Sequence, residues 1–329
     1  MMDAARWKAG VKRFLFWLFY YSGLELLVAR CIKIDAAAVI MYHGVCNDSR
    51  LPPEVDFHLT ADAFDRHLRM LKRRYPVISL RQLLERLERG EPLQKAVVIT
   101  FDDGYRNNAT VAHPILERHS LPYTIFISTA YVGNGHWLPL NQLYALWHFG
   151  RITHGRMKEL RQEIRRRPAS AAGHLVQDAG MLKPAEKALA ENSFGMLSWD
   201  EVRRLAAQGV EFGSHTHTHC NMAAETPVEQ LAELQSARNL IRAETGADAA
   251  TFAYPFGRSD NWNQETRASV IAAGHRCAIL ANGGLVKPRQ DVFALPRVGY
   301  ASKEAWAFAC QLTLLFLKDY LKRKDRLKP

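Results

Sequence analysis

The sequence predicts an α/β fold in which parallel strands and helices alternate and form a closed or nearly closed barrel. Strand-like and helix-like segments alternate from about residue 36 to residue 300. The strand-like segments are short apolar runs, as expected for strands covered on both faces. The two most polar motifs directly follow such runs, and barrel active sites lie at the carboxyl ends of strands. A doubly wound open sheet is the alternative architecture.

Each expected element has a local signal. The strands are the apolar runs at residues 38–42, 97–101, 123–128, 210–212, 251–254 and 276–280. The expected helices carry apolar residues at helical spacing. One begins after Thr60, and one reaches Leu116 after the strand at 97–101. The others cover residues 80–87, 199–207, 228–244 and 265–273. Hydroxyl side chains at Thr60, Ser79 and Ser198 are expected to cap helices, and Gly90 to end one.

We divide the chain into a barrel at residues 36–300, an N-terminal segment at 1–35 and a C-terminal helix at 301–329. A helical insertion at about 137–196 interrupts the alternation, and we expect it to lie over one face of the barrel and to shape the substrate groove. No internal repeat is evident.

Both ends have the character of membrane contacts. Residues 14–29 are apolar and aromatic with flanking cations, but they are shorter than the about 20 residues that span a bilayer, and they include Glu25. A helix in the membrane interface fits this pattern, with a signal peptide or a core helix as alternatives. From Trp306 to Tyr320, apolar residues recur at helical spacing before a basic tail, which indicates a basic amphipathic helix or a docking helix. We therefore expect peripheral attachment at the cytoplasmic face of a membrane; a periplasmic or exported location stays open.

The net charge of +11 invites a nucleic-acid interpretation, but no nucleic-acid-binding signature accompanies the basic clusters. The cluster Arg161 and Arg165 to Arg167 is interpreted as a solvated face or as a contact with an anionic membrane. The five cysteines are scattered and contain no CxxC pair, so neither a zinc ribbon nor a thioredoxin-like site is indicated.

Two carboxylates, Asp102 and Asp103, follow the apolar run at 97–101 and precede Gly104. Because the chain turns at the end of a strand, both can face one cleft. Two carboxylates in one cleft repel each other, and their ionisation is costly unless positive charge lies between them, which suggests a bound cation.

Three histidines in five residues, His215, His217 and His219, follow a second strand-like run. One helical turn would place His215 and His219 on the same face. Imidazole and carboxylate ligands together suit zinc or a similar divalent ion, and two His with one Asp leave positions open, as catalysis requires. His217 is expected to point away and to have a structural role.

These two motifs, Thr100 to Gly104 and Ser214 to His219, resemble those of the polysaccharide deacetylase family, the chitin-deacetylase-like carbohydrate esterases. The resemblance covers about residues 36–300. It implies a distorted (β/α) barrel with a divalent metal, usually zinc, that hydrolyses an acetyl group from a sugar. It also implies that Asp103, His215 and His219 bind the metal and that Asp102 is the general base.

The third family motif is represented by residues 252–257, in which Tyr254, Pro255 and Phe256 are implied to contact substrate. Ala253 stands where the family usually has an arginine that orients the base. We expect Arg297 to replace it, with an ordinary surface arginine as the alternative. The usual Leu-x-His motif, the source of the general acid, is not visible near residue 295.

His43 is our candidate for that acid, and a histidine hydrogen-bonded at a strand end is the alternative. Similar departures occur in the branch that resembles poly-N-acetylglucosamine deacetylases. We therefore expect a metal-dependent deacetylase that acts on an N-acetylated glycan or glycolipid in surface-polysaccharide metabolism. The alternatives are an O-deacetylase or deformylase using the same site, and a catalytically silent carbohydrate-binding or scaffolding protein.

Overall fold

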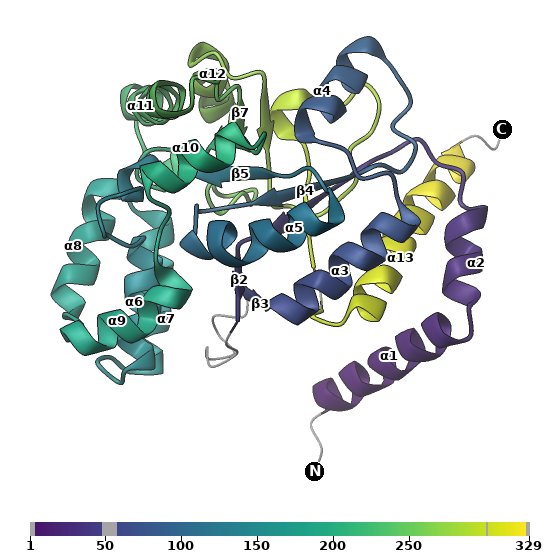
Figure 1. The fold of residues 1–329 in the computed structure, drawn as a ribbon, viewed down its shortest axis with the longest axis horizontal. Coiled ribbons are helices and arrows are strands. Elements are labelled where there is room, and N and C mark those ends of the chain that lie inside the picture. Colours follow the sequence, from purple (N-terminus) through teal and green to yellow (C-terminus); the bar gives the residue numbers. More distant parts are fainter. Residues whose placement is uncertain (1–3, 48–57, 301, 327–329) are drawn as a thin grey trace.

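The computed structural model describes residues 4–47, 58–300 and 302–326 (Figure 1). The large sheet contains seven parallel strands in the order β8-β7-β6-β5-β4-β1-β9, and β2 and β3 form a separate parallel pair. The strands are β1 (Ala38–Tyr42), β2 (Gly44–Cys46), β3 (His58–Thr60), β4 (Val97–Phe101), β5 (Thr124–Ile127), β6 (Glu211–Ser214), β7 (Thr251–Ala253), β8 (Cys277–Ile279) and β9 (Val298–Gly299).

The helices surround this sheet. They are α1 (Ala4–Tyr21), α2 (Leu24–Cys31), α3 (Ala61–Arg74), α4 (Leu80–Arg89), α5 (His113–His119), α6 (Pro139–His148), α7 (His154–Arg166), α8 (Ala169–Ala179), α9 (Pro184–Phe194), α10 (Trp199–Ala207), α11 (Pro227–Thr245), α12 (Gln264–Ala272) and α13 (Ala305–Arg326). The expected hydroxyl caps are present, since Thr60, Ser79 and Ser198 each accept a backbone N–H of the first turn. Gly90 ends α4 in the left-handed conformation, as expected.

The sheet curls into a distorted (β/α) barrel, so the predicted fold is confirmed and the open sheet is not adopted. The closure depends on the segment that leads into β9. Leu295 forms a parallel bridge with Ile279 of β8, and β9 then pairs with β1 at the other end of the strand order. One short stretch of chain therefore links both edges of the sheet, and it brings Arg297 into the barrel.

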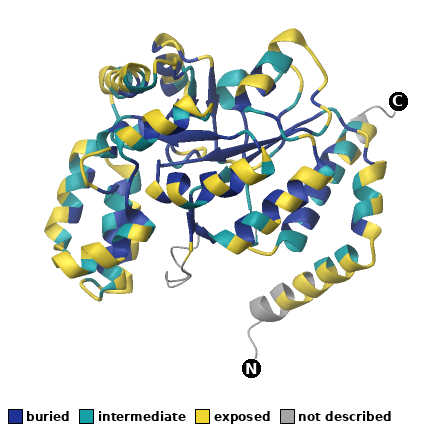
Figure 2. Cartoon of the chain, in the orientation of Figure 1, coloured by how far each residue is buried: buried dark blue, intermediate teal, exposed yellow. Residues whose placement is uncertain are grey.

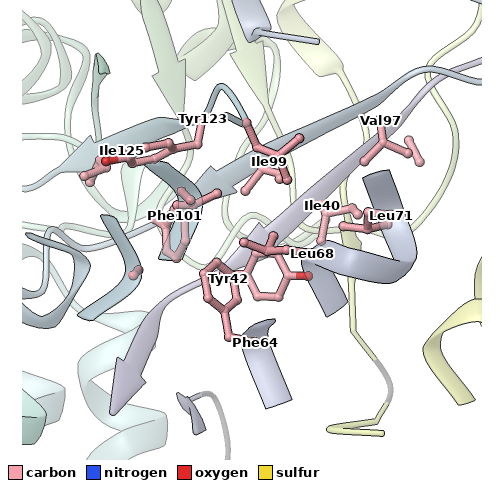
Figure 3. Packing of buried hydrophobic residues seen from close by; sticks show 14 of the residues in the cluster. Ile40, Tyr42, Phe64, Leu68, Leu71, Val97, Ile99, Phe101, Tyr123 and Ile125 are labelled. Atoms are coloured by element: carbon pink, nitrogen blue, oxygen red, sulfur yellow. The ribbon is translucent and has the colours of Figure 1, made fainter. Parts of the chain in front are cut away.

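The alternation of side chains along each strand divides the apolar residues between two sides of the sheet. Ile40 and Tyr42 of β1 pack outward against Phe64, Leu68 and Leu71 of α3 (Figure 3). Another cluster joins Val39, Val98, Phe126, Ala253 and Ile279, from strands far apart in the sheet order, with leucines of α4. This second cluster fills the interior of the barrel. Thr100 and Asp102 have the same parity as Val98, so the alternation turns Asp102 inward at the end of β4.

The expected helical insertion comprises α6 to α9, which lie together on the side of the barrel away from α1 and α2 (Figure 1). It has its own apolar core, which includes Leu143, Leu160 and Phe194. Tyr105, next to the active-site motif, belongs to the same cluster, so the insertion is packed directly against the functional end of the barrel.

The N-terminal apolar run is not one helix, as the sequence had suggested, but two. The chain breaks at Ser22 and Gly23, where Gly23 has a φ of 79°, and the two halves differ in direction by 76°. Among the described residues, no single helix is long and apolar enough to cross a membrane, although this bent pair passes a test of length and composition. Glu25 is fully buried and pairs with Arg74 of α3, and Thr313 of α13 donates a hydrogen bond to it.

The C-terminal helix docks on the domain. Phe308, Leu312 and Phe316 of α13 are buried in the main core, so the docking alternative is the correct one for its apolar face. The end of the basic tail, residues 327–329, lies outside the described residues. By contrast, the part of α1 whose burial is described, residues 10–11 and 13–21, is largely exposed (Figure 2).

Candidate active site

Asp102 is held by a buried arginine from the far end of the chain. Arg297 donates from Nη1 to Asp102 Oδ1 at 2.5 Å and from Nη2 to Oδ2 at 2.6 Å, so both carboxylate oxygens are engaged. The same guanidinium donates to Thr100 Oγ1 at 3.3 Å and to the carbonyl of Leu280 at 3.2 Å. Arg297 is 1% exposed and Asp102 3% exposed. The carboxylate is therefore fixed in position by a planar, two-point contact.

Asp103 lies beside the two histidines that the sequence singled out. Its Oδ1 is 3.5 Å from Nε2 of His215 and 3.3 Å from Nε2 of His219. Nδ1 of His215 donates to the carbonyl of Ala253 at 2.7 Å, so a neutral His215 in this tautomer, the form that binds a metal, presents an unprotonated Nε2 toward Asp103. The three candidate ligand atoms lie within 4.8 Å of one another. This donor set fits a divalent ion bound by one carboxylate and two imidazoles.

The two histidines do not converge through a helical turn, and that part of the sequence interpretation is wrong. Residues 215–221 form a loop in which Thr216 and His219 have positive φ values of 62° and 58°. Glu233 of α11 fixes this loop by accepting from the Thr218 backbone N–H and hydroxyl, both at 2.8 Å. His217 points elsewhere, as expected, since its Nδ1 shares a hydrogen bond of 2.8 Å with the Thr129 hydroxyl.

The electrostatics of this cluster favour positive charge between the carboxylates. Burial alone would raise the pKa of Asp103, but hydrogen bonds from His215 and His219 lower it well below the usual range. Burial would likewise lower the pKa of His215, and the charge of Asp102 together with contacts to Asp103 raises it instead. Burial dominates at His219 and lowers its pKa. Burial also opposes ionisation of Asp102, but the charge of Arg297 keeps its pKa below the usual value.

A pocket of about 250 Å³ opens onto these groups. It is lined by Asp102, Asp103, His219 and Arg297, together with His43, Tyr254 and Phe256 from the sequence analysis. Pro255 is not among its lining residues. His43 is partly buried and is one of the residues that line the pocket, and its backbone carbonyl accepts a hydrogen bond from Asn108 at 2.8 Å. The structure thus brings almost all of the predicted site residues together.

Several pocket residues were missed. The insertion contributes Leu138, Leu140, Asn141, Tyr144 and Arg165, and the loop after β7 contributes Arg258. Tyr105, directly after the motif, donates from its hydroxyl to Asn141 Oδ1 at 2.8 Å. Arg165 belongs to the basic cluster interpreted as a solvated face, and for this residue that interpretation is wrong. The only available signal was the position of the cluster within an insertion expected to shape the groove.

Comparison with known proteins finds matches to deacetylases. The family model described as polysaccharide deacetylase matches residues 89–278. A curated relative, "Putative polysaccharide deacetylase YxkH" of Bacillus subtilis (strain 168), is 23% identical over 264 residues, covering 79% of this chain and 70% of that protein.

Solved structures show the same fold. The deacetylase PplD of Streptococcus pyogenes, in complex with acetate, aligns with a TM-score of 0.55 at 18% identity, covering 80% of this chain and 92% of that one. IcaB from Ammonifex degensii aligns with a TM-score of 0.56 at 17% identity, covering 85% and 98%.

The fold and the site define a sugar-acting hydrolase, since the matched family is one of deacetylases. The chain belongs to the polysaccharide deacetylase family.

Proposed function

We propose that this protein is a divalent-metal-dependent deacetylase that removes N-acetyl groups from a glycan or a lipid-linked amino sugar in surface-polysaccharide metabolism. The observation that carries the proposal is the buried Asp102–Arg297 pair beside the Asp103, His215 and His219 cluster. A binding protein needs no fixed carboxylate next to a metal cluster. The family membership supports the deacetylase chemistry, and the departure at Ala253 is compensated by Arg297.

The residues present fit a bound metal. Asp103, His215 and His219 would hold it, and the hydrogen bond from His215 to Ala253 fixes the tautomer that a ligand requires. Imidazole and carboxylate ligands favour zinc. A divalent ion there would acidify a water molecule and polarise the acetyl carbonyl.

The remaining chemistry belongs to the chain's own residues. Asp102, ionised and oriented by Arg297, would accept a proton from the water that attacks the acetyl carbon. The C–N bond then breaks, and the leaving nitrogen takes up a proton, for which His43 is the candidate donor on the pocket wall. The products are acetate and the free amine. Tyr254 and Phe256 are the candidate contacts to the sugar.

The test is acetate release from N-acetylated oligosaccharides and lipid-linked sugars, with metal analysis of the purified protein. Asp102→Asn should abolish turnover and retain the metal, whereas His215→Ala should lose both. Asp178→Asn, at an exposed position on the insertion, is the matched control and should keep both. Full turnover in Asp102→Asn would overturn the mechanism. Release of formate, or acetate release without a new amine, would favour a deformylase or an O-deacetylase.

We also propose that α1 and α2 attach the protein to the cytoplasmic face of a membrane. Phe14, Leu18 and Tyr21 are 60%, 49% and 60% exposed, and Leu27 on α2 is 59% exposed. Single exposed leucines are ordinary, but a row of apolar and aromatic residues with exposed flanking cations is typical of an interfacial helix.

Membrane attachment is tested by sedimentation with anionic phospholipid vesicles and by detergent-free fractionation. Leu18→Glu should reduce vesicle binding, whereas Leu189→Glu, on the insertion where Leu189 is 73% exposed, should not. Recovery of all the protein in the soluble pool, with no vesicle binding, would refute attachment.

A further inference from the structure

Two arginines line the active-site pocket without a carboxylate partner. Arg165 comes from α7 of the insertion, and Arg258 comes from the loop that follows β7. Arg297, the third arginine of the pocket, is neutralised by Asp102. Among the residues that the structure describes, neither Arg165 nor Arg258 has a carboxylate at ion-pair distance. Surface arginines of this chain are commonly paired, as in Arg151–Glu186 and Arg106–Glu201.

Arg165 is positioned close to the metal cluster. Its guanidinium lies over the ring of Phe256 at 5.1 Å from the centroid. The Phe256 ring also contacts the ring of His219, one of the candidate metal ligands, with 5.0 Å between the two ring centroids. Since each contact measures about 5 Å, the guanidinium lies within about 10 Å of the His219 ring. It can thus reach the sugar whose acetyl group enters the metal site, or the neighbouring unit.

The positive charge at this side of the pocket is crowded. Burial lowers the pKa of Arg165, and the charges of Arg161 and Arg258 lower it further, against the opposing effects of Tyr144 and Asp260. The Nε atoms of Arg161 and Arg165 are both buried without a hydrogen-bond partner among the described residues. Crowded, partly desolvated cations with unsatisfied donors are costly, and an anionic ligand would relieve that cost.

We propose that the substrate is an acetylated amino sugar that carries an anionic group, a phosphate or a carboxylate, and that Arg165 and Arg258 bind this group. This inference rests on the proposed deacetylase function. Guanidinium groups suit both anions because their planar donors form two parallel hydrogen bonds to a pair of oxygens. A glycosyl phosphate, as in a lipid-linked sugar, and a uronate-type sugar within a polymer present the same chemistry to these residues.

The test compares acetate release from three N-acetylated monosaccharides. These are the neutral N-acetylglucosamine, N-acetylglucosamine 1-phosphate and the carboxylate-bearing N-acetylmuramic acid. The wild-type protein should have a higher kcat/KM for at least one anionic sugar than for the neutral one. Arg165→Gln and Arg258→Gln should each raise KM for that anionic sugar about 10- to 100-fold, the effect of losing a charge-assisted hydrogen bond, and change kcat/KM for the neutral sugar by a much smaller factor.

Arg166→Gln is the matched control, because Arg166 is the next residue on α7 and is exposed. It should leave all three substrates unaffected, and Arg165→Lys should restore only part of the selectivity. The anionic sugar whose kcat/KM falls more in Arg165→Gln shows which group, phosphate or carboxylate, the arginines bind. Acetate release from the neutral sugar without preference for either anion, or an equal loss on all three sugars in both Gln variants, would overturn this inference and leave the proposed function standing. Absence of acetate release from all three sugars and from the N-acetylated oligosaccharides and lipid-linked sugars would overturn both.

Discussion

Replacing Arg297 tests both the catalytic and the structural account of the site. Arg297 makes two contacts of 2.5 and 2.6 Å to Asp102 and is 1% exposed, so Arg297→Met leaves a buried carboxylate without its partner. Removing one member of a buried ion pair costs about 3–5 kcal/mol. For a chain of this length, with an unfolding entropy of about 0.7 kcal/mol/K, this corresponds to a decrease in Tm of about 4–7 °C. Turnover should fall by at least about 100-fold because the base is no longer oriented.

The assays are thermal unfolding, acetate release and metal content. The hydrogen bonds of Arg297 go to Leu280, Thr100 and Asp102 and not to the candidate metal ligands, so the metal should remain bound in Arg297→Met. Adding Asp102→Asn to this variant should recover part of the lost stability, because both members of the pair are then neutral. Arg297→Lys keeps the charge but not the two-point contact. Compared with Arg297→Met, it should restore more of the wild-type Tm than of the wild-type rate of acetate release. The reasoning is refuted if Arg297→Met unfolds at the wild-type temperature and releases acetate at the wild-type rate.

Three further predictions concern stability. Glu25→Gln removes the charge that pairs with Arg74 across α2 and α3, so it should lower the free energy of unfolding by about 3 kcal/mol and expose α1 and α2 to limited proteolysis. Burial lowers the pKa of His275 to about 4. Below pH 6.5 the unfolded chain therefore binds the proton first, and stability falls as the pH drops toward about 4. Between pH 7 and pH 5 this histidine alone should cost about 2 kcal/mol in denaturant titrations, a loss that is absent in His275→Gln. Gly104→Ala should abolish metal binding and lower Tm, because Gly104 has a φ of 86° and its Cβ would lie 2.9 Å from Ile127 Cγ2; a variant with normal metal content would contradict this.

The features that the sequence predicted correctly depend on local chemistry. The strand Val97–Phe101 and the helix Trp199–Ala207 have the predicted limits because an apolar run and a hydroxyl cap act on adjacent residues. Asp102 and Asp103 were recognisable because they end such a run. Arg297 was assigned to Asp102 through the missing family arginine, and the structure brings the two together.

The features that were missed depend on contacts between distant segments. The bend between α1 and α2 lies at Gly23, whereas the docking of Glu25 against Arg74 and Thr313 joins segments far apart in the sequence, and no local pattern reveals it. Short strands such as β9, two residues long, are defined by their partners rather than by their own composition. Arg165 is one of several arginines in a basic run, and only the packing of the insertion against Tyr105 distinguishes it from its neighbours.

The backbone around the site explains why the spacing of the histidines led to the wrong local structure. Asp103, Thr216, His219 and Phe256 all have positive φ, a conformation that is costly for residues other than glycine. Each such residue costs of the order of 1–3 kcal/mol and persists only where surrounding contacts enforce it. Here those contacts are identifiable, since Glu233 holds Thr218 and the Ala253 carbonyl holds His215. The strained residues belong to the candidate metal-binding cluster or lie beside it, so the packing of the barrel stabilises a geometry that the loops would not adopt alone.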